Sequence, residues 1–388
     1  MPVSRRVALE SISAITSSVL RNVKFSEIPI GDGGYLHRLR AIRFDVRISS
    51  AAHAGTANAP IDWNLVLGNV SLECAGDFVG PKNLSGPDLQ AIRKFFTGRK
   101  LPWLSQNDTA TAVGDANEAA GTNEGRRVVF EYRFDAFGAG ALDFCPMISY
   151  LAKENATLSY QVNLPTNSTA LTAEIAVYLE LEPTADIIAV APIVSELISV
   201  DKLEGGSIAG GLILGTMFKN AADWAGAGTD LTRVSAEADG RQILKDIEPN
   251  TLFLDSGEES ADLVAAVNHY CHAMYPDDMP PTNHANRYKP FLCAWHSRDR
   301  RFTKKPVCRS ISYTLTGSES AANLTFLHTR AKPVTAALCA KTWASSGKLT
   351  AEDIESALAN NGVKLKSLAK TRMSGDHAAF APVKYSPR

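Results

Sequence analysis

The chain has 388 residues, of which 45% are hydrophobic and 21% are charged, and its formal net charge is -1. This composition is typical of a well-cored globular protein and excludes a disordered chain. The balanced charge argues against binding polyanions over the whole surface, and the length predicts two domains. No apolar run approaches the roughly 18 residues of a membrane span. The first residues lack the hydrophobic core of a secretion signal, so we expect no cleaved signal.

The first expected element is a helix over residues 4–24. Its apolar residues recur at spacings of three and four, as on one face of a helix, and Ser4 can cap its start. These apolar residues are Leu9, Ile12, Ile15, Val19 and Val23. Basic residues mark the two ends, at Arg5, Arg6, Arg21 and Lys24. Two interpretations stay open: a helix packed beneath the first β domain, or an amphipathic arm lying against an acidic surface such as lipid headgroups.

Strand patterns follow this segment. Apolar and polar residues alternate over 42–48, and a second strand is expected from about Trp63 to Cys74. Residues 87–97 predict a short helix with Pro87 near its start. Residues 105–125 are rich in Asn, Asp, Thr, Ala and Gly, which predicts a long exposed loop. Loops of this length are usually functional or form interfaces.

The clearest pattern lies between Arg126 and Pro183. Three segments there, at about 128–135, 158–164 and 174–181, alternate strictly between apolar and polar residues. Strict alternation places one row of side chains on a buried face. Three such strands need partner strands to cover that face, so the segment predicts the heart of an antiparallel β-sandwich or barrel.

The second half repeats this pattern more loosely after an apolar connector at 185–204. Strands are expected near 208–218, 241–254, 288–295, 310–316 and 324–329, with helical spacing at 262–275 and a long loop at 277–290. A helix at 351–360 and a basic tail follow. The predicted division is an arm at 1–29, a first domain at 30–184, a second at 185–345 and a tail at 346–388.

Motifs of common enzymes are absent: the sequence has no GxxxxGK[ST], GxGxxG, GxSxG or HExxH. Cysteine and histidine gather in one region, but the spacing is irregular for a structural zinc site. Nothing beside Cys271 or Cys293 favours a cysteine nucleophile, and the basic run at 298–305 is more typical of a solvated loop than of a nucleic-acid site. We therefore predict no catalytic, cofactor-binding or metal-binding residue. The cysteine- and histidine-rich region contains His269, Cys271, His272, His284, Cys293 and His296.

The order of these segments resembles the double jelly-roll major capsid proteins of tailless, membrane-containing icosahedral bacteriophages, the tectivirus-like group. Residues 33–46 resemble the first strand of that family's first jelly roll, and residues 127–134, 156–163 and 174–181 resemble its later strands. Residues 309–316 and 323–330 resemble the last strands of its second jelly roll. The resemblance covers nearly the whole chain as an order of elements, and sandwiches of this kind recur across many functions.

The resemblance implies an all-β fold of two consecutive eight-stranded antiparallel jelly rolls, with an N-terminal helix and a helical or extended C-terminal tail. It implies a homotrimer that forms a pseudo-hexagonal block of an icosahedral shell, located in the virion and assembled in the host cytoplasm. The implied partners are further trimers, vertex or penton and minor capsid proteins, and an internal lipid membrane facing the arm, with no sequence-specific nucleic acid, no cofactor and no enzymatic activity. The two long loops would make inter-subunit contacts through Asn107, Asp115, Asn123, Asp277 and Asn283.

Two other classes of protein remain open. One is a two-domain β-sandwich that binds carbohydrate or a receptor, for example as a surface or fibre component. Exposed aromatic residues at loop tips would favour it, but the tryptophans show no clustering in the sequence. The other is a Cys/His enzyme or metalloprotein built around 269–296, which requires those side chains to meet in space. The tryptophans are Trp63, Trp103, Trp224, Trp295 and Trp343.

Overall fold

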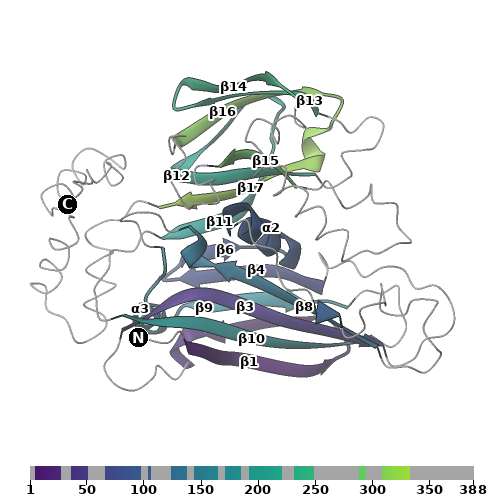
Figure 1. The fold of residues 1–388 in the computed structure, drawn as a ribbon, viewed down its shortest axis with the longest axis vertical. Helices are drawn as coiled ribbons and strands as arrows, with labels where there is room; N and C mark the ends of the chain where they lie inside the picture. The colour runs from purple at the N-terminus through teal and green to yellow at the C-terminus, as the bar shows by residue number, and fades with distance from the viewer. Residues whose placement is uncertain are drawn as a thin grey trace, which may run out of the picture.

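The part of the protein that the structure describes consists mainly of β-strands, stacked along the longest axis (Figure 1). The first half of the chain forms the lower part of this view and the second half forms the upper part. The structure is a computed structural model. It describes residues 5–27, 36–50, 66–97, 104–105, 124–137, 144–164, 171–184, 192–220, 231–248, 288–293 and 308–332.

The first half is a sandwich of two antiparallel sheets. One has the strand order β1-β10-β3-β8, extended by the short β7 (Leu104–Ser105), and the other has the order β2-β9-β4-β5. Numbered along the chain, strands one, eight, three and six therefore face strands two, seven, four and five, which is the jelly-roll topology. The strands are β1 (Arg5–Ile15), β2 (Val19–Lys24), β3 (Leu36–Ser50), β4 (Leu67–Cys74), β5 (Asp77–Phe78), β8 (Glu124–Arg133), β9 (Thr157–Val162) and β10 (Leu171–Thr184).

The second half repeats this order. Strands β11, β17, β12 and β15 form one sheet layer, and β12, β16, β13 and β14 form the other. Strand β12 takes part in both layers, because residues 204–209 pair with β16, residues 212–220 pair with β17, and Ile213 pairs with both. The strands are β11 (Ile193–Ser199), β12 (Glu204–Asn220), β13 (Leu231–Ala238), β14 (Arg241–Ile247), β15 (Tyr288–Cys293), β16 (Cys308–Gly317) and β17 (Leu324–Ala331).

Two glycines let β12 change layers. Gly210 and Gly211 have φ angles of 111° and 132°, which side chains rarely tolerate. A Cβ atom on Gly211 would also lie 2.6 Å from the carbonyl oxygen of Ala331. A bend at this point lets one continuous strand serve two sheets, as at the corners of other β-sandwiches.

Buried aromatic residues fill the first sandwich. Phe44 of β3 and Tyr160 of β9 meet edge to face across the two sheets, with ring centroids 5.5 Å apart. Phe130 and Tyr132 of β8 are fully buried on the same face as the sequence alternation predicts. The all-β fold and the three strands expected between Arg126 and Pro183 are therefore confirmed, as β8, β9 and β10.

The helix expected over residues 4–24 is wrong, since this segment forms β1 and β2. The apolar spacing misled because β1 has irregularities in register between Ala8 and Glu10 and between Ile12 and Ile15. Each bulge inserts an extra residue, so a two-residue repeat becomes a spacing of three that imitates a helix face. The paired strands belong to the first sandwich, because β1 pairs with β10 and β2 with β9.

The structure corrects three further expectations. Residues 36–50, expected to begin the first jelly roll, form its third strand. The connector at 185–204 contains β11, the first strand of the second roll. Strand β13, at 231–238, was missed because its larger buried residues, Leu231 and Val234, are three apart and the other two are alanines, so the sequence shows no apolar alternation. The expected strands at 208–218, 288–295, 310–316 and 324–329 are confirmed as β12, β15, β16 and β17.

Short helices complete the described fold. The helix expected at 87–97 is confirmed as α2 (Gly86–Thr97), and α3 (Ile148–Lys153) lies in the region expected to hold a helical turn. The 3-10 turns are η1 (Phe25–Glu27), η2 (Phe134–Ala136) and η3 (Ala321–Asn323). Outside the described residues lie most of the loop expected at 105–125, the segments at 262–275 and 351–360, and the whole tail from 346. The predicted domain limits, at 29, 184 and 345, remain predictions.

Candidate functional site

The two rolls are connected at a joint, which contains a strand pairing, shared apolar packing and ion pairs. The short strand β6 (Gly80–Lys82) of the first half pairs with β11 of the second, with Gly80 beside Val194 and Lys82 beside Glu196. This is the one parallel pairing among the strands that the structure describes. It extends a sheet of the second roll into the first, and α2 lies beside it (Figure 1).

Apolar packing continues across this joint. Ile193, Met217 and Leu327 come from the second roll, yet they are buried within the core cluster of the first roll. Three buried hydroxyl groups lie beside them: the Tyr132 oxygen is 2.9 Å from Ser195 Oγ, which is 2.8 Å from Thr329 Oγ1. Burial raises the pKa of Tyr132, so its hydroxyl stays protonated. The two rolls therefore share one continuous interior.

Each of two carboxylates at the joint is bound by a lysine from the opposite roll. The first is Glu196 of β11, whose Oε2 lies 2.6 Å from Lys82 Nζ, while Arg330 of β17 lies 2.9 Å from its Oε1. Burial alone would raise the pKa of Glu196, but the hydrogen bond from Lys82 and the charge of Arg330 outweigh it and hold the pKa below its usual range. Glu196 therefore stays charged and joins β6 to β17.

The second carboxylate is Asp88 at the start of α2, which is 1% exposed and lies 2.7 Å from Lys219 of β12. Its carboxylate also accepts hydrogen bonds from the backbone N–H and the hydroxyl of Ser85, at 2.9 and 2.6 Å. Burial opposes the charged form, but Lys219 and Ser85 together hold the pKa of Asp88 below its usual value. An acid in the first turn also complements the helix dipole. Asp88 thus fixes the start of α2 to the second roll.

A row of polar side chains crosses four strands at the joint. Lys82, Glu196, His328 and Thr216 are cross-strand neighbours on β6, β11, β17 and β12. His328 and Thr216 are fully buried, and the Thr216 hydroxyl lies 2.8 Å from His328 Nδ1. Nε2 of His328 has no hydrogen-bond partner within the described part of the chain. The member of this row on β6, Lys82, is a charged residue, whereas the member on β12, Thr216, is uncharged.

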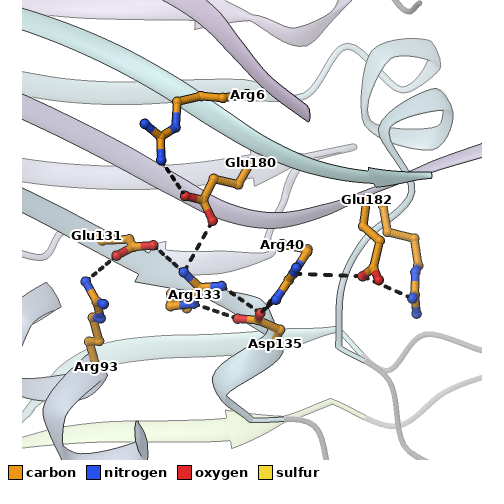
Figure 2. A network of polar contacts seen from close by, with 9 residues as sticks. Arg6, Arg40, Arg93, Glu131, Arg133, Asp135, Glu180 and Glu182 are labelled. Carbon is orange, nitrogen blue, oxygen red and sulfur yellow. Dashed lines mark hydrogen bonds and ion pairs between the residues drawn. The ribbon is translucent and has the colours of Figure 1, made fainter. Parts of the chain in front are cut away.

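A second polar feature lies on the outer face of the first roll (Figure 2). Its centre is Arg133 of β8, which binds Asp135 through two hydrogen bonds of 2.8 and 2.7 Å and Glu131 through one of 2.7 Å. Glu131 also accepts from Arg93, which brings α2 onto the sheet. The outer ion pairs are Arg133–Glu180, Arg6–Glu180, Arg40–Asp135, Arg40–Glu182 and Arg38–Glu182.

This Arg133 network is suited to clamping strands and not to chemistry. Burial of Asp135 would raise its pKa, but Arg133 and Arg40 hold it below the usual value. Burial of the Arg133 guanidinium would lower its pKa, but the hydrogen bonds that it donates to Asp135 and the charges of the nearby acids raise the pKa overall. Groups fixed in their charged form at neutral pH cannot exchange a proton with a substrate. The network instead links β1, β10, β3, β8 and α2.

The residues predicted as a membrane-facing arm lie on β1 and β2. Arg6 is 3.1 Å from Glu180, and Arg21 Nε is 2.9 Å from Glu10. Arg5 and Lys24 occupy strand positions opposite Leu181 and Thr157. The four residues thus belong to the first roll and do not form a separate helix. Whether this edge faces a membrane stays a prediction.

The remaining predicted site residues lie mostly outside the described residues. This holds for the loop residues Asn107, Asp115, Asn123, Asp277 and Asn283, whose inter-subunit role stays a prediction. Of the Cys/His region, Cys293 is placed on β15 opposite Gly215, and the others lie outside. Within the described ranges no three His, Cys, Asp or Glu side chains gather as metal ligands do. No helix there is long and apolar enough to cross a membrane.

Sequence reasoning did not find the joint. Strand β6 has three residues and includes a proline, so it has no alternation to recognise. The one available signal was the apolar stretch before Ser195, which was interpreted as a connector. A nearly continuous apolar run is typical of a strand buried on both faces, and the end of this stretch, Ile193 and Val194, begins β11, whose first four residues are buried.

Comparisons with known proteins found similar solved structures but no similar sequence family. No protein-family model and no curated protein sequence matches the chain. Similar solved structures include double jelly-roll major capsid proteins of viruses. The STIV major capsid protein has a TM-score of 0.46 and 13% identity over 84% of this chain and 97% of its own. PBCV-1 VP54 has a TM-score of 0.44 and 9% identity, over 86% and 95%. The mavirus major capsid protein has a TM-score of 0.32 and 9% identity, over 84% and 86%. Likenesses at this level say nothing of function by themselves, and the double jelly-roll fold of this chain rests on its own strand order.

Proposed function

We propose that the chain is a viral major capsid protein, a building block of an icosahedral shell. The observation that carries the proposal is the repeated strand order: the second half pairs its strands in the same jelly-roll order as the first. Because one chain contains two similar jelly rolls, it contributes two similar units to an assembly. Three chains related by a threefold axis would then present six similar units, which can pack as a pseudo-hexagonal tile.

The joint supports this proposal because a shell tile must hold its shape under lateral load. Two rolls on a free linker would rotate against one another, as domains with small interfaces do. Here the parallel pairing of β6 with β11, the shared core and the buried pair of Lys219 with Asp88 all oppose such rotation. Rigid geometry is what a tile requires, and catalysis plays no part in the proposal.

The proposed partners are further copies of this chain and the minor proteins that fill vertices of a shell, and the proposed location is the virion. A membrane-facing arm is not part of the proposal. The helix that suggested it is replaced by β1 and β2, whose pairing with β10 and β9 uses the segment inside the first roll.

The mass of the purified protein in solution, by native mass spectrometry, tests the proposal. The expected species is a trimer of the 41.7 kDa chain that forms hexagonal arrays or closed shells under electron microscopy at high protein concentration. A monomer that forms no array at any concentration contradicts the proposal. The carbohydrate- or receptor-binding class would then be examined by glycan-array binding.

A further inference from the structure

The one fully buried histidine among the described residues lies in the sheet that forms the joint, on the face that carries Phe326 and the core of the second roll. His328 is 0% exposed, on β17 between Glu196 of β11 and Thr216 of β12. Only its Nδ1 has a partner, the Thr216 hydroxyl at 2.8 Å. The ring is therefore held in a site that satisfies one nitrogen and leaves Nε2 bare within the described part of the chain. A neutral ring fits such a site, because one of its nitrogens carries no hydrogen.

A protonated ring does not fit. It carries a hydrogen on both nitrogens, so one N–H would be buried without an acceptor, which costs free energy. Of the charged groups around it, Arg330 on the same strand repels the positive ring, and Glu196 on β11 attracts it. Glu196 is already shared between Lys82 of β6 and Arg330. Strand β12 offers the uncharged Thr216 in this row.

We propose that His328 makes the joint between the two rolls acid-labile: protonation of its ring at mildly acidic pH separates β17 from β11 and β12 and loosens the second roll from the first. The path is short. Arg330, two residues along the same strand, binds both Glu196 of the joint and the carbonyl of Gly210 at the corner of β12. A positive charge on His328 repels Arg330 and so weakens both contacts.

The direction of the pH effect follows from linkage. Burial first, and then the charge of Arg330, lower the pKa of His328 from 6.5 to about 4. The unfolded chain therefore takes up a proton from about pH 6.5 downward, while the folded chain resists until about pH 4. The contribution of His328 to stability is complete above about pH 6.5 and is lost progressively as the pH falls from there toward 4.

The first test needs no variant. Slow deuterium exchange at the imidazole C2 position, read by mass spectrometry across a pH series, reports the pKa of a single histidine. Trypsin cleaves after Arg309 and Arg330, and the peptide 310–330 contains His328 as its one histidine. The expected midpoint lies well below 6, with slow exchange. A midpoint near 6.5 overturns the proposal.

The second test locates the effect. Backbone amide exchange is measured at pH 7 and pH 5 and corrected for the intrinsic rate. Protection of β6, β11 and β17 is expected to fall by roughly tenfold or more at pH 5, whereas β3 and β10 keep theirs. In His328→Gln, which keeps a polar group beside Thr216, the loss at β11 should disappear. Equal protection of β11 at both pH values in the wild type contradicts the proposal, as does an undiminished loss in the variant.

A thermal measurement gives the global counterpart. Between pH 7 and pH 5 the wild-type melting temperature should fall roughly 3 °C more than that of His328→Gln. Equal falls count against the proposal. All three tests concern the single chain, so they stand whether or not it assembles into trimers, and a monomeric protein that passes them would contradict only the proposed function.

Discussion

The two rolls share a strand order but pass from their second to their third strand differently. In the first roll β2 ends at Lys24 and β3 begins at Leu36, so the chain has residues 25–35 in which to change sheets. In the second roll β12 continues through this point, and Gly210 and Gly211 alone make the bend. The same topology therefore depends on two individual residues in one half and on a whole segment in the other.

The equivalent sheets of the two rolls also differ on their outer faces. In the first roll this face carries the Arg133 network of partly exposed acidic and basic side chains. In the second roll the same face packs on the first roll, with Ser195, Thr329 and Leu327 buried there. An identical architecture thus uses charge where water reaches the sheet, and small hydroxyls with apolar groups where protein covers it.

The largest effect is expected from Gly211→Ala. The substitution combines an unfavourable φ of 132° with a contact of 2.6 Å to a backbone carbonyl, which cannot move aside cheaply. We expect a loss of about 3 kcal/mol or more in unfolding free energy, measured by urea denaturation. Gly68→Ala in β4 is the matched control, because nothing lies within 4 Å of its added Cβ. Equal losses of unfolding free energy in both variants would contradict the conclusion that β12 depends on Gly211 to change sheets.

The buried ion pair of the joint comes next. Lys219→Met leaves Asp88 charged and 1% exposed, and breaking such a pair typically costs about 3–5 kcal/mol. The loss should be much smaller in the double variant with Asp88→Asn, since no charge is then left unpaired. Arg233→Met serves as control, because its partner Asp246 is 3.9 Å away and both are exposed. If Arg233→Met lost as much unfolding free energy as Lys219→Met, the buried pair at the joint would contribute no more to stability than an exposed pair.

A smaller loss is expected at the outer face. Arg133→Met removes the centre of a partly exposed network and leaves Glu131 buried at 2% exposure with Arg93 as its remaining partner. Partial burial predicts a loss of about 2 kcal/mol, less than at the joint. The loss should shrink in 1 M salt, which screens partly exposed pairs. The Arg47–Glu174 pair, 4.0 Å apart and more exposed, supplies the control Arg47→Met. A loss unaffected by salt would argue against an electrostatic clamp.

The smallest effect is a gain. Ala75 occupies the first central position of the turn between β4 and β5, with a φ of 54° that alanine adopts at a cost. Asparagine accepts this conformation, and Asn-Gly is favoured in two-residue hairpins. Ala75→Asn should therefore raise the melting temperature and add about 0.5 kcal/mol. An unchanged or lower value would mean that strain at this turn is relieved elsewhere.

The part of the fold that could be predicted is the part with regular alternation. Strands such as β8 and β10 place every second residue in the core, so their pattern is readable from the sequence. Strand β1 could not be read, because its two bulges alter the spacing of Val7, Leu9 and Ile12. The repeat of one topology in both halves was expected from the family resemblance and not from any residue pattern.

The joint could not be predicted at all. Glu196 and His328 look like ordinary polar residues in strands, and their partners lie more than a hundred residues away: Glu196 of β11 pairs with Lys82 of β6 and with His328 of β17. A buried charge leaves no periodic signature, since its partner can come from any part of the chain. The same holds for Asp88, whose helix was predicted from the sequence but whose partner Lys219 was not.

The pairing of β1 with β10 has a consequence for synthesis on the ribosome. Arg6 meets Glu180, 174 residues later in the chain, so β1 emerges long before its partner exists. At translation rates of about 5–20 residues per second this is a wait of roughly 10–30 s, with β1 and the sheet edge beside it uncovered. The first roll can close only when β10 arrives between β1 and β3, and the nascent chain is therefore most exposed to mispairing and to chaperones in that interval.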